Sequence, residues 1–555
     1  MHSAIFFLAA LAACLFWTAA CTAAGVRCKR GWLRRLLLGL GLLAPLISLL
    51  PWLAATTMLA FVAHLEVNGF GPVLTLFLSA VIGGAWIQRA GTQPRGGGWA
   101  TVPAATWPTA RLAALFMLSK ASTVGMLLLL DGTVLDEARL LRLEASSLMQ
   151  ANLPPLVADT DNAARRYEAA FVLLKDETEG DQPTSPLFLA ATADPTSPAV
   201  IELLRRHRNT LAILRDAASM DVCRFTRDWT RPSVDMVLPE LQDFRQAARL
   251  LQLAARHAAA EGQAVEALQD VCLMARLSQH AANEPFLISG LVGLAIDSMT
   301  LTTLTDLLPT LTPDELALLD SHELRDMLVL TPTLKRHFFG EEAFGLRTFA
   351  AFTDASLGLE VLAAGGIQAS DGIPWATPSS SLLASPAMMF YRVFLLPADL
   401  ACYRRTMRFQ QQLMAQELSY LERKAAIDAL EHPFTESRAG ILSNLILPGL
   451  SAAIQAEVAS QMRHQAAEVA VAATRMRLEE GRLPATLSEL VPRYLPAGPR
   501  DLFDAGEPLR LTRTDDALTI YSVGPNGTDD GGPDAAASDP HNKTDDVGLG
   551  LSLSL

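Results

Sequence analysis

The chain has 555 residues, of which 50% are hydrophobic and 19% charged, and its formal net charge is −13. This length exceeds one ordinary domain, and the apolar fraction is high for a protein that lies wholly in water. The acidic balance argues against nucleic acid as a partner, because its phosphates would be repelled.

The charges are unevenly placed along the chain. Residues 1–130 hold nine Lys and Arg and one acid, a formal charge of +8, whereas the remainder holds 36 basic and 57 acidic residues, a formal charge of −21. Four apolar stretches in the basic part approach the roughly 20 residues needed to cross a bilayer. They are residues 3–25, 36–60, 69–87 and 110–130.

The basic residues predict the orientation of these stretches. Five of them lie between the first and second stretch, and three more follow the third, so both loops are expected in the cytoplasm. The sequence therefore predicts a multi-pass protein of the inner (cytoplasmic) membrane, in contact with the lipid bilayer, with everything after Asp131 on the extracytoplasmic side. A cleaved or lipidated start at "LAAC", Leu11 to Cys14, is the alternative, although no basic residue precedes it.

The region from 131 to about 450 shows helical periodicity and almost no strand signal. Apolar residues three and four apart on both sides of Gly262 predict two helices in a hairpin. Pro285 introduces a third helix of about 22 residues, and Asp297 with the Thr and Ser residues after it favours a core helix over a membrane span. Thr312 to Glu315 form a helix start.

Known catalytic patterns are missing from this helical region. "HELRD", His322 to Asp326, lacks the second His of the zinc-peptidase pattern, and no G-x-S-x-G, S-x-x-K, P-loop or G-x-G-x-x-G occurs. The sequence therefore predicts no enzyme, the alternative being an envelope hydrolase with carboxylates in the helical region. "CRFTRDWTRP", Cys223 to Pro232, is interpreted as a loop packed by salt bridges, with a ligand site as its alternative.

The cysteines show no ligand spacing, so a zinc site is not expected. Three of them, Cys223, Cys272 and Cys402, lie beyond the apolar N-terminal part. An extracytoplasmic location would allow one disulfide among these three, without saying which.

The C-terminal part reads as a small α+β module. An apolar stripe from Ile454 predicts a long helix that stops at Gly481, and Thr486 with Glu489 predicts a capping box for a short second helix. Residues 509–514 and 518–523 alternate as a β-hairpin. The expected domains are 1–130, four transmembrane helices; 131–450, mainly helical and extracytoplasmic; and 451–555, the α+β module with an acidic loop and tail.

This module resembles the C-terminal domain of the major pseudopilin of type II secretion. The residues that fall on the S-x-G-x-[DN]-G…GG…DD tail of that family are Ser522, Gly524, Asn526, Gly527, Gly531, Gly532, Asp545 and Asp546. In the family this loop binds Ca²⁺, so the resemblance implies an oxygen-rich calcium site. Its candidate ligands are Asn526, Asp529, Asp530, Asp545 and Asp546.

The family's N-terminal cleavage site and its Glu-bearing apolar helix start are absent, because some 450 residues precede the long helix. Polymerisation is therefore not implied. The alternative to a metal-ordered loop is a solvated polar tail.

"DNAARRYEAAF", "CRFTRDW" and "LISGLVGLAI", together with the C-terminal module, are similar to a group of uncharacterised bacterial membrane-anchored proteins. That resemblance implies no particular activity. The expected role is interaction or assembly with a protein partner in the cell envelope.

Overall fold

The structure is a computed structural model and describes a large part of the chain. The described residues are 31–33, 36, 137–175, 186–191, 193–229, 238–320, 326, 333–353, 395–416, 418–436, 440, 442–447, 449–514, 517–533 and 545–552. The chain divides into two compact units. The first comprises Met1–Leu143, Leu346–Arg405 and Pro433–Ile446, and the second Glu144–Gly345, Thr406–His432 and Leu447–Leu555.

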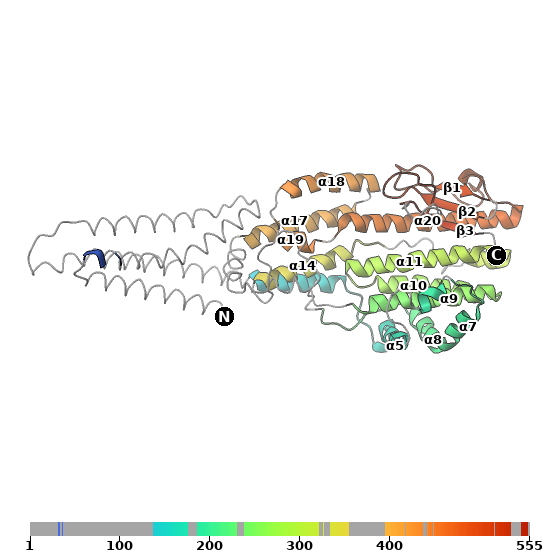
Figure 1. Cartoon of the computed structure of the whole chain (residues 1–555), viewed down its shortest axis with the longest axis horizontal. Coiled ribbons are helices and arrows are strands. Elements are labelled where there is room, and N and C mark those ends of the chain that lie inside the picture. Colours follow the sequence, from blue (N-terminus) through green and yellow to red (C-terminus); the bar gives the residue numbers. More distant parts are fainter. Residues whose placement is uncertain are drawn as a thin grey trace, which may run out of the picture. The chain divides into compact units, whose positions relative to one another are not determined.

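Helices dominate the described residues (Figure 1). After the helical residues 31–33 and 36, a helix covers residues 137–152. The longer helices that follow are α5 (Ala163–Lys175), α7 (Pro198–Arg206), α8 (Arg208–Ala218), α9 (Glu240–Ala260), α10 (Ala264–Ala281), α11 (Leu287–Leu307), α14 (His337–Thr353), α17 (Leu396–Ala415), α18 (Tyr420–Glu436) and α20 (Leu450–Glu480). The short helices and 3-10 turns are η1 (Asp159–Asp161), α6 (Pro186–Ala191), η2 (Leu308–Thr310), α12 (Pro313–Ala317), η3 (Leu318–Asp320), α19 (Leu442–Ile446) and η5 (Leu487–Glu489).

The strands form one antiparallel sheet near the end of the chain. β1 (Arg510–Arg513), β2 (Ala517–Ser522) and β3 (Val547–Ser552) lie in the order β1-β2-β3. Leu511 pairs with Ile520, and Ile520 pairs with Leu549 on the other side. The side chains of Leu518, Ile520, Leu549 and Leu551 are buried, because β2 and β3 pack against α20 and β3 also packs against α11.

The predicted hairpin of helices is confirmed as α9 and α10. α9 ends just before Gly262, which adopts a left-handed conformation with φ +75°. The backbone N–H of Gly262 donates to the carbonyl oxygen of Ala259. α11 then packs along α10, α9 and α20 (Figure 1). The predicted helix start at Thr312 is also confirmed, since Thr312 and Glu315 form a capping box.

Aromatic rings fill the core of the second unit between α5, α8, α9 and α10. Tyr167 and Phe171 on α5 meet Phe244 on α9, with ring centroids 5.0 and 5.2 Å from its ring centroid. The buried Tyr167 hydroxyl shares a hydrogen bond of 2.9 Å with Nδ1 of His280. In the first unit, Phe349 and Tyr403 pack with centroids 5.3 Å apart. The carboxylate of Asp399 there accepts the backbone N–H of Leu442 at the start of α19.

The predicted fold class is wrong in its membrane part. Among the described residues one helical stretch, Leu287–Thr310, is long and apolar enough to cross a membrane, not four, and 67% of its apolar window is buried inside the protein. Nearly all of the four predicted spans lies outside the described residues. The physical reason is that an apolar run of about 20 residues suits a protein interior as well as a bilayer. The mainly helical part and the small antiparallel sheet agree with the prediction.

One further prediction is corrected at the C-terminal module, and one strand is added. The capping box at Thr486 does not form, because Glu489 instead accepts from Arg482 and from the N–H of Ala485, and only the turn η5 follows. A third strand, β3, was not predicted. The long helix α20 does end at Gly481, φ +71°, as expected.

Candidate functional site

The acidic connection from β2 to β3 is the site that the sequence singled out. It leaves the sheet after Ser522 and returns at Val547, and the structure describes it up to residue 533 and again from 545. All five predicted ligands lie on it. Asn526, Asp529 and Asp545 are exposed, Asp530 is half-buried and Asp546 is buried.

Two carboxylates hold the two ends of this connection together. Asp546 Oδ2 accepts the backbone N–H groups of Asp530 and Gly532 at 3.1 and 2.7 Å. Asp530 Oδ2 accepts from Nδ2 of Asn526 and from the N–H of Asp545, both at 3.1 Å. Burial raises the pKa of Asp546, against these two N–H groups, which lower it. The described part is therefore a closed, hydrogen-bonded loop, unlike a solvated tail.

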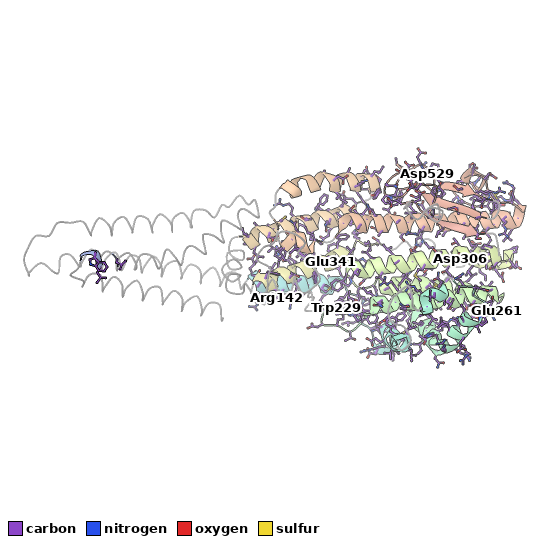
Figure 2. All side chains as sticks on the ribbon, viewed as in Figure 1. Arg142, Trp229, Glu261, Asp306, Glu341 and Asp529 are labelled. Atoms are coloured by element: carbon purple, nitrogen blue, oxygen red, sulfur yellow. The ribbon has the colours of Figure 1, made fainter. Side chains whose placement is uncertain are left out.

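Asp529 points back to the sheet and is neutralised there. Its Oδ2 accepts from Nε of Arg510 at 2.9 Å, and its Oδ1 accepts from the hydroxyl of Tyr521 at 3.1 Å. Burial, with this hydrogen bond and the nearby charge, raises the pKa of Tyr521. Figure 2 labels Asp529 beside the strands.

Asp501 binds the residues at the base of the loop, and the sequence patterns did not indicate it as a site residue. Its carboxylate is fully buried and accepts from the hydroxyl of Ser522 at 2.6 Å and from the N–H of Val523 at 3.0 Å. Arg510 Nη1 lies 3.5 Å from the same carboxylate. The D-x-[FW] spacing of Asp501 and Phe503 is the sequence signal that could have found it.

The five predicted ligands thus share one loop, but their oxygens are directed mostly to donors of the protein itself. In the part of the chain that the structure describes, no group of three or more His, Cys, Asp or Glu side chains is arranged to hold a metal ion. Asp529 fits a metal site least, because Arg510 already compensates its charge. Oxygens of Asn526, Asp530, Asp545 and Asp546 are the donors that could turn to a hard cation.

The close contact between Gly524 and Asp545 predicts that a side chain at position 524 would open this loop. A Cβ at Gly524 would overlap the carbonyl oxygen of Asp545, whereas a Cβ at Gly527 would meet nothing within 4 Å. Both residues are left-handed, with φ +66° and +68°. Gly524→Ala is therefore expected to open the loop, and Gly527→Ala to cost only the backbone strain of about 1–2 kcal/mol. Proteolysis of the full chain within residues 524–546 measures this, and equal cleavage rates for the two variants would contradict it.

A second polar site lies inside the helical part of the second unit. The guanidinium of Arg227 pairs with Glu240 on α9 and with Glu284 after α10, where Nε lies 3.1 Å from Oε1 of Glu284. Its cation also lies 5.7 Å from the ring centroid of Phe225 and of Trp229. Burial raises the pKa of Glu284 to about 7, against Arg227, which lowers it. Salt-bridged packing, the favoured interpretation of "CRFTRDW", is confirmed.

The turn between α10 and α11, residues 282–286, is held from its other side by α14 and the residues just before it. Arg336 Nη2 and His337 Nε2 donate to the carbonyl oxygen of Ala282 at 2.7 and 2.9 Å. Glu341 Oε1 accepts the first backbone N–H of α11, that of Leu287, at 2.8 Å. Burial lowers the pKa of His337 to about 4, so its ring is neutral at physiological pH. Figure 2 labels Glu341 and Trp229 in this part of the molecule.

A third polar cluster joins α11 to α20. Oδ2 of Asp297 accepts from Ser460 Oγ and from His464 Nε2, both at 2.9 Å. All three residues are buried. Because Ser and His both bond to the same carboxylate oxygen, this arrangement satisfies polar groups inside the core.

The cysteines form no disulfide among the described residues: Cys223 and Cys402 are buried and Cys272 is half-buried. Comparison of the chain with protein-family models, with curated proteins and with solved structures found no match. The site therefore has to be interpreted from its own geometry.

Proposed function

We propose that this protein is a non-enzymatic interaction or assembly protein of the cell envelope, and that the β2–β3 loop is its contact surface. The observation that carries the proposal is the construction of this loop. Its backbone N–H groups turn inward to Asp530 and Asp546, while Asn526 and Asp545 remain exposed. Asp529 is also exposed, but its charge is compensated by Arg510. A preorganised acidic surface binds a partner at little entropic cost.

The chemistry of this surface suits a protein partner with a basic segment, or a Ca²⁺ ion shared with one. Exposed carboxylates steer positively charged partners and select against acidic ones. The resemblance to the pseudopilin C-terminal domain supports an assembly role. The basic, apolar composition of residues 1–130 supports a location at the inner membrane.

An envelope hydrolase is the second candidate, and one observation favours it. Glu284, whose pKa burial raises to about 7, has the proton affinity of a general acid near neutral pH. However, the side chains of Glu240 and Glu284 are only 8% and 5% exposed and are paired with Arg227. A substrate would have to displace that pairing, so we favour the interaction role.

Photo-crosslinking tests the contact surface directly. A photoreactive amino acid at Asn526 of the full chain in its native envelope is expected to give one discrete protein adduct, and Asp545→Asn is expected to weaken it. The same amino acid at Glu261, exposed at the end of α9, is the control. Equal labelling at both positions, or none at Asn526, would contradict the proposal.

Calcium titration by calorimetry on the purified full chain tests the metal route. If the loop takes Ca²⁺, binding in the micromolar range is expected and should be lost in the Asp545→Asn, Asp546→Asn variant. Glu507→Gln, an exposed acid outside the loop, should bind as the natural chain does. If no heat is released at millimolar Ca²⁺, the calcium route is wrong, and the loop would have to contact its partner without a metal ion.

A further inference from the structure

Two buried carboxylates share one guanidinium at Arg227. The side chains of Arg227, Glu240 and Glu284 are 13%, 8% and 5% exposed. Arg227 Nη2 donates to Glu240 and lies 3.2 Å from Oε1 of Glu284, whose Oε2 is buried without a hydrogen-bond partner among the described residues. With both acids ionised the cluster carries one uncompensated negative charge. A buried charge of this kind is costly, and protonation of one acid removes it.

Among the described residues, Arg227 is the one cation that lowers the pKa of either acid. Arg227 is the cation that faces Glu284, and from α9 Asp243 adds a further negative field at Glu240. The buried thiol of Cys223 lies on the same segment as Arg227, and burial raises its pKa well above the usual value, so it is neutral. On the α14 side the charged and titratable groups contact the backbone of the 282–287 turn; they are Arg336, His337 and Glu341.

The cluster sits where a chain segment without regular structure is fastened to the helices. Residues 223–229 are held to the turn after α10 by Arg227 and by Asn283, whose Nδ2 donates to the carbonyl oxygen of Cys223 at 2.9 Å. Asn162, at the start of α5, accepts the N–H of Arg224 at 2.9 Å. Without the Arg227 pairing, the N-terminal end of this segment would still be held by Asn162, Asn283 and the packing of Phe225, whereas Trp229 would be held by its stacking on Phe286.

We propose that the Arg227–Glu240–Glu284 cluster is a pH-responsive latch, which fastens residues 223–229 to the α10–α11 turn while one of the two acids is protonated and loosens when both are ionised. The latch is a conformational device of the helical part, and it does not depend on the contact role of the β2–β3 loop.

The direction of the pH effect follows from the two states. In the closed state the pKa of Glu284 is raised to about 7 from an ordinary value of 4.5. Between these values the closed state holds a proton that the open state has released, so closing weakens as the pH rises. The opening equilibrium is expected to increase by up to about tenfold per pH unit from pH 5 to 7 and to level off above about 7.

Hydrogen exchange measured by mass spectrometry on the full chain tests the latch. After correction for the intrinsic exchange rate, peptides covering residues 223–229 and 282–287 should lose protection between pH 5 and 7 in the natural chain. Glu284→Gln should make their protection independent of pH. Glu261→Gln, an exposed acid on the same domain, should keep the natural profile.

A second variant keeps the test decisive if Glu284→Gln fails to fold. Glu240→Gln leaves one acid for one guanidinium, so the pKa of Glu284 should fall and the pH dependence should flatten. A natural profile that is flat over this range, or a slope that survives in either variant, would overturn the proposal.

Discussion

Replacing Arg227 with methionine is expected to destabilise the folded chain by about 3–5 kcal/mol, because the removal of one partner leaves buried charges without compensation. Glu240 and Glu284 would both keep their carboxylates in the core and lose the guanidinium between them. Methionine retains much of the side chain's apolar volume, so the loss reports charge more than packing. Chemical denaturation of the full chain, followed by circular dichroism, measures the change.

Arg205→Met is the matched control for this prediction. Arg205 also forms an ion pair, with Glu202 at 2.8 Å, but the two side chains are 71% and 46% exposed. An exposed pair contributes about 0–1 kcal/mol, so this variant should change stability little. Combining Arg227→Met with Glu240→Gln and Glu284→Gln should recover part of the loss, since no buried charge remains. Equal effects of Arg227→Met and Arg205→Met would show that the Arg227 cluster is not buried in solution.

Gly340→Ala is expected to be the most disruptive single methyl group in the second unit, with a loss of about 3 kcal/mol or more. A Cβ at this position of α14 would overlap the carbonyl oxygen of Pro285, which is backbone and cannot rotate away. Alanine is intrinsically the better helix former by about 1 kcal/mol, so the clash has to outweigh a favourable change. Thermal unfolding of the full chain measures the result.

Gly498→Ala is the control for the added methyl group. Gly498 is exposed, and a Cβ there would meet nothing within 4 Å. Its unfolding temperature should stay close to that of the natural chain. A Gly340→Ala protein as stable as this control would mean that α14 does not pack on the 282–287 turn as described.

Local patterns predicted the elements whose signals lie close together in the sequence. The α9–α10 hairpin follows from apolar spacing and one glycine, and the β1–β2 hairpin follows from alternation around a short turn. β3 was missed because Gly548 and Gly550 occupy its outward positions, which hides the alternation of Val547, Leu549 and Leu551. Glycine is poor in strands, so composition argued against a strand there.

The partners in the polar sites could not be predicted, because they are distant in the sequence. Arg227 meets carboxylates 13 and 57 residues away, and Asp297 meets His464 167 residues later. The charges in "CRFTRDW" indicated salt-bridged packing without indicating with which acids. The resemblance placed the five candidate ligands on one loop, whereas the hydrogen bonds that hold it came only from the structure.

The packing of β3 against α11 has a consequence for synthesis of the protein on the ribosome. α11 is complete some 240 residues before Val547–Ser552, so a long apolar helix emerges well before the strand that covers part of it. Contacts of such sequence separation form slowly, and uncovered apolar surface invites aggregation in the meantime. The nascent chain should therefore bind chaperones or a membrane surface through α11 until the sheet is complete.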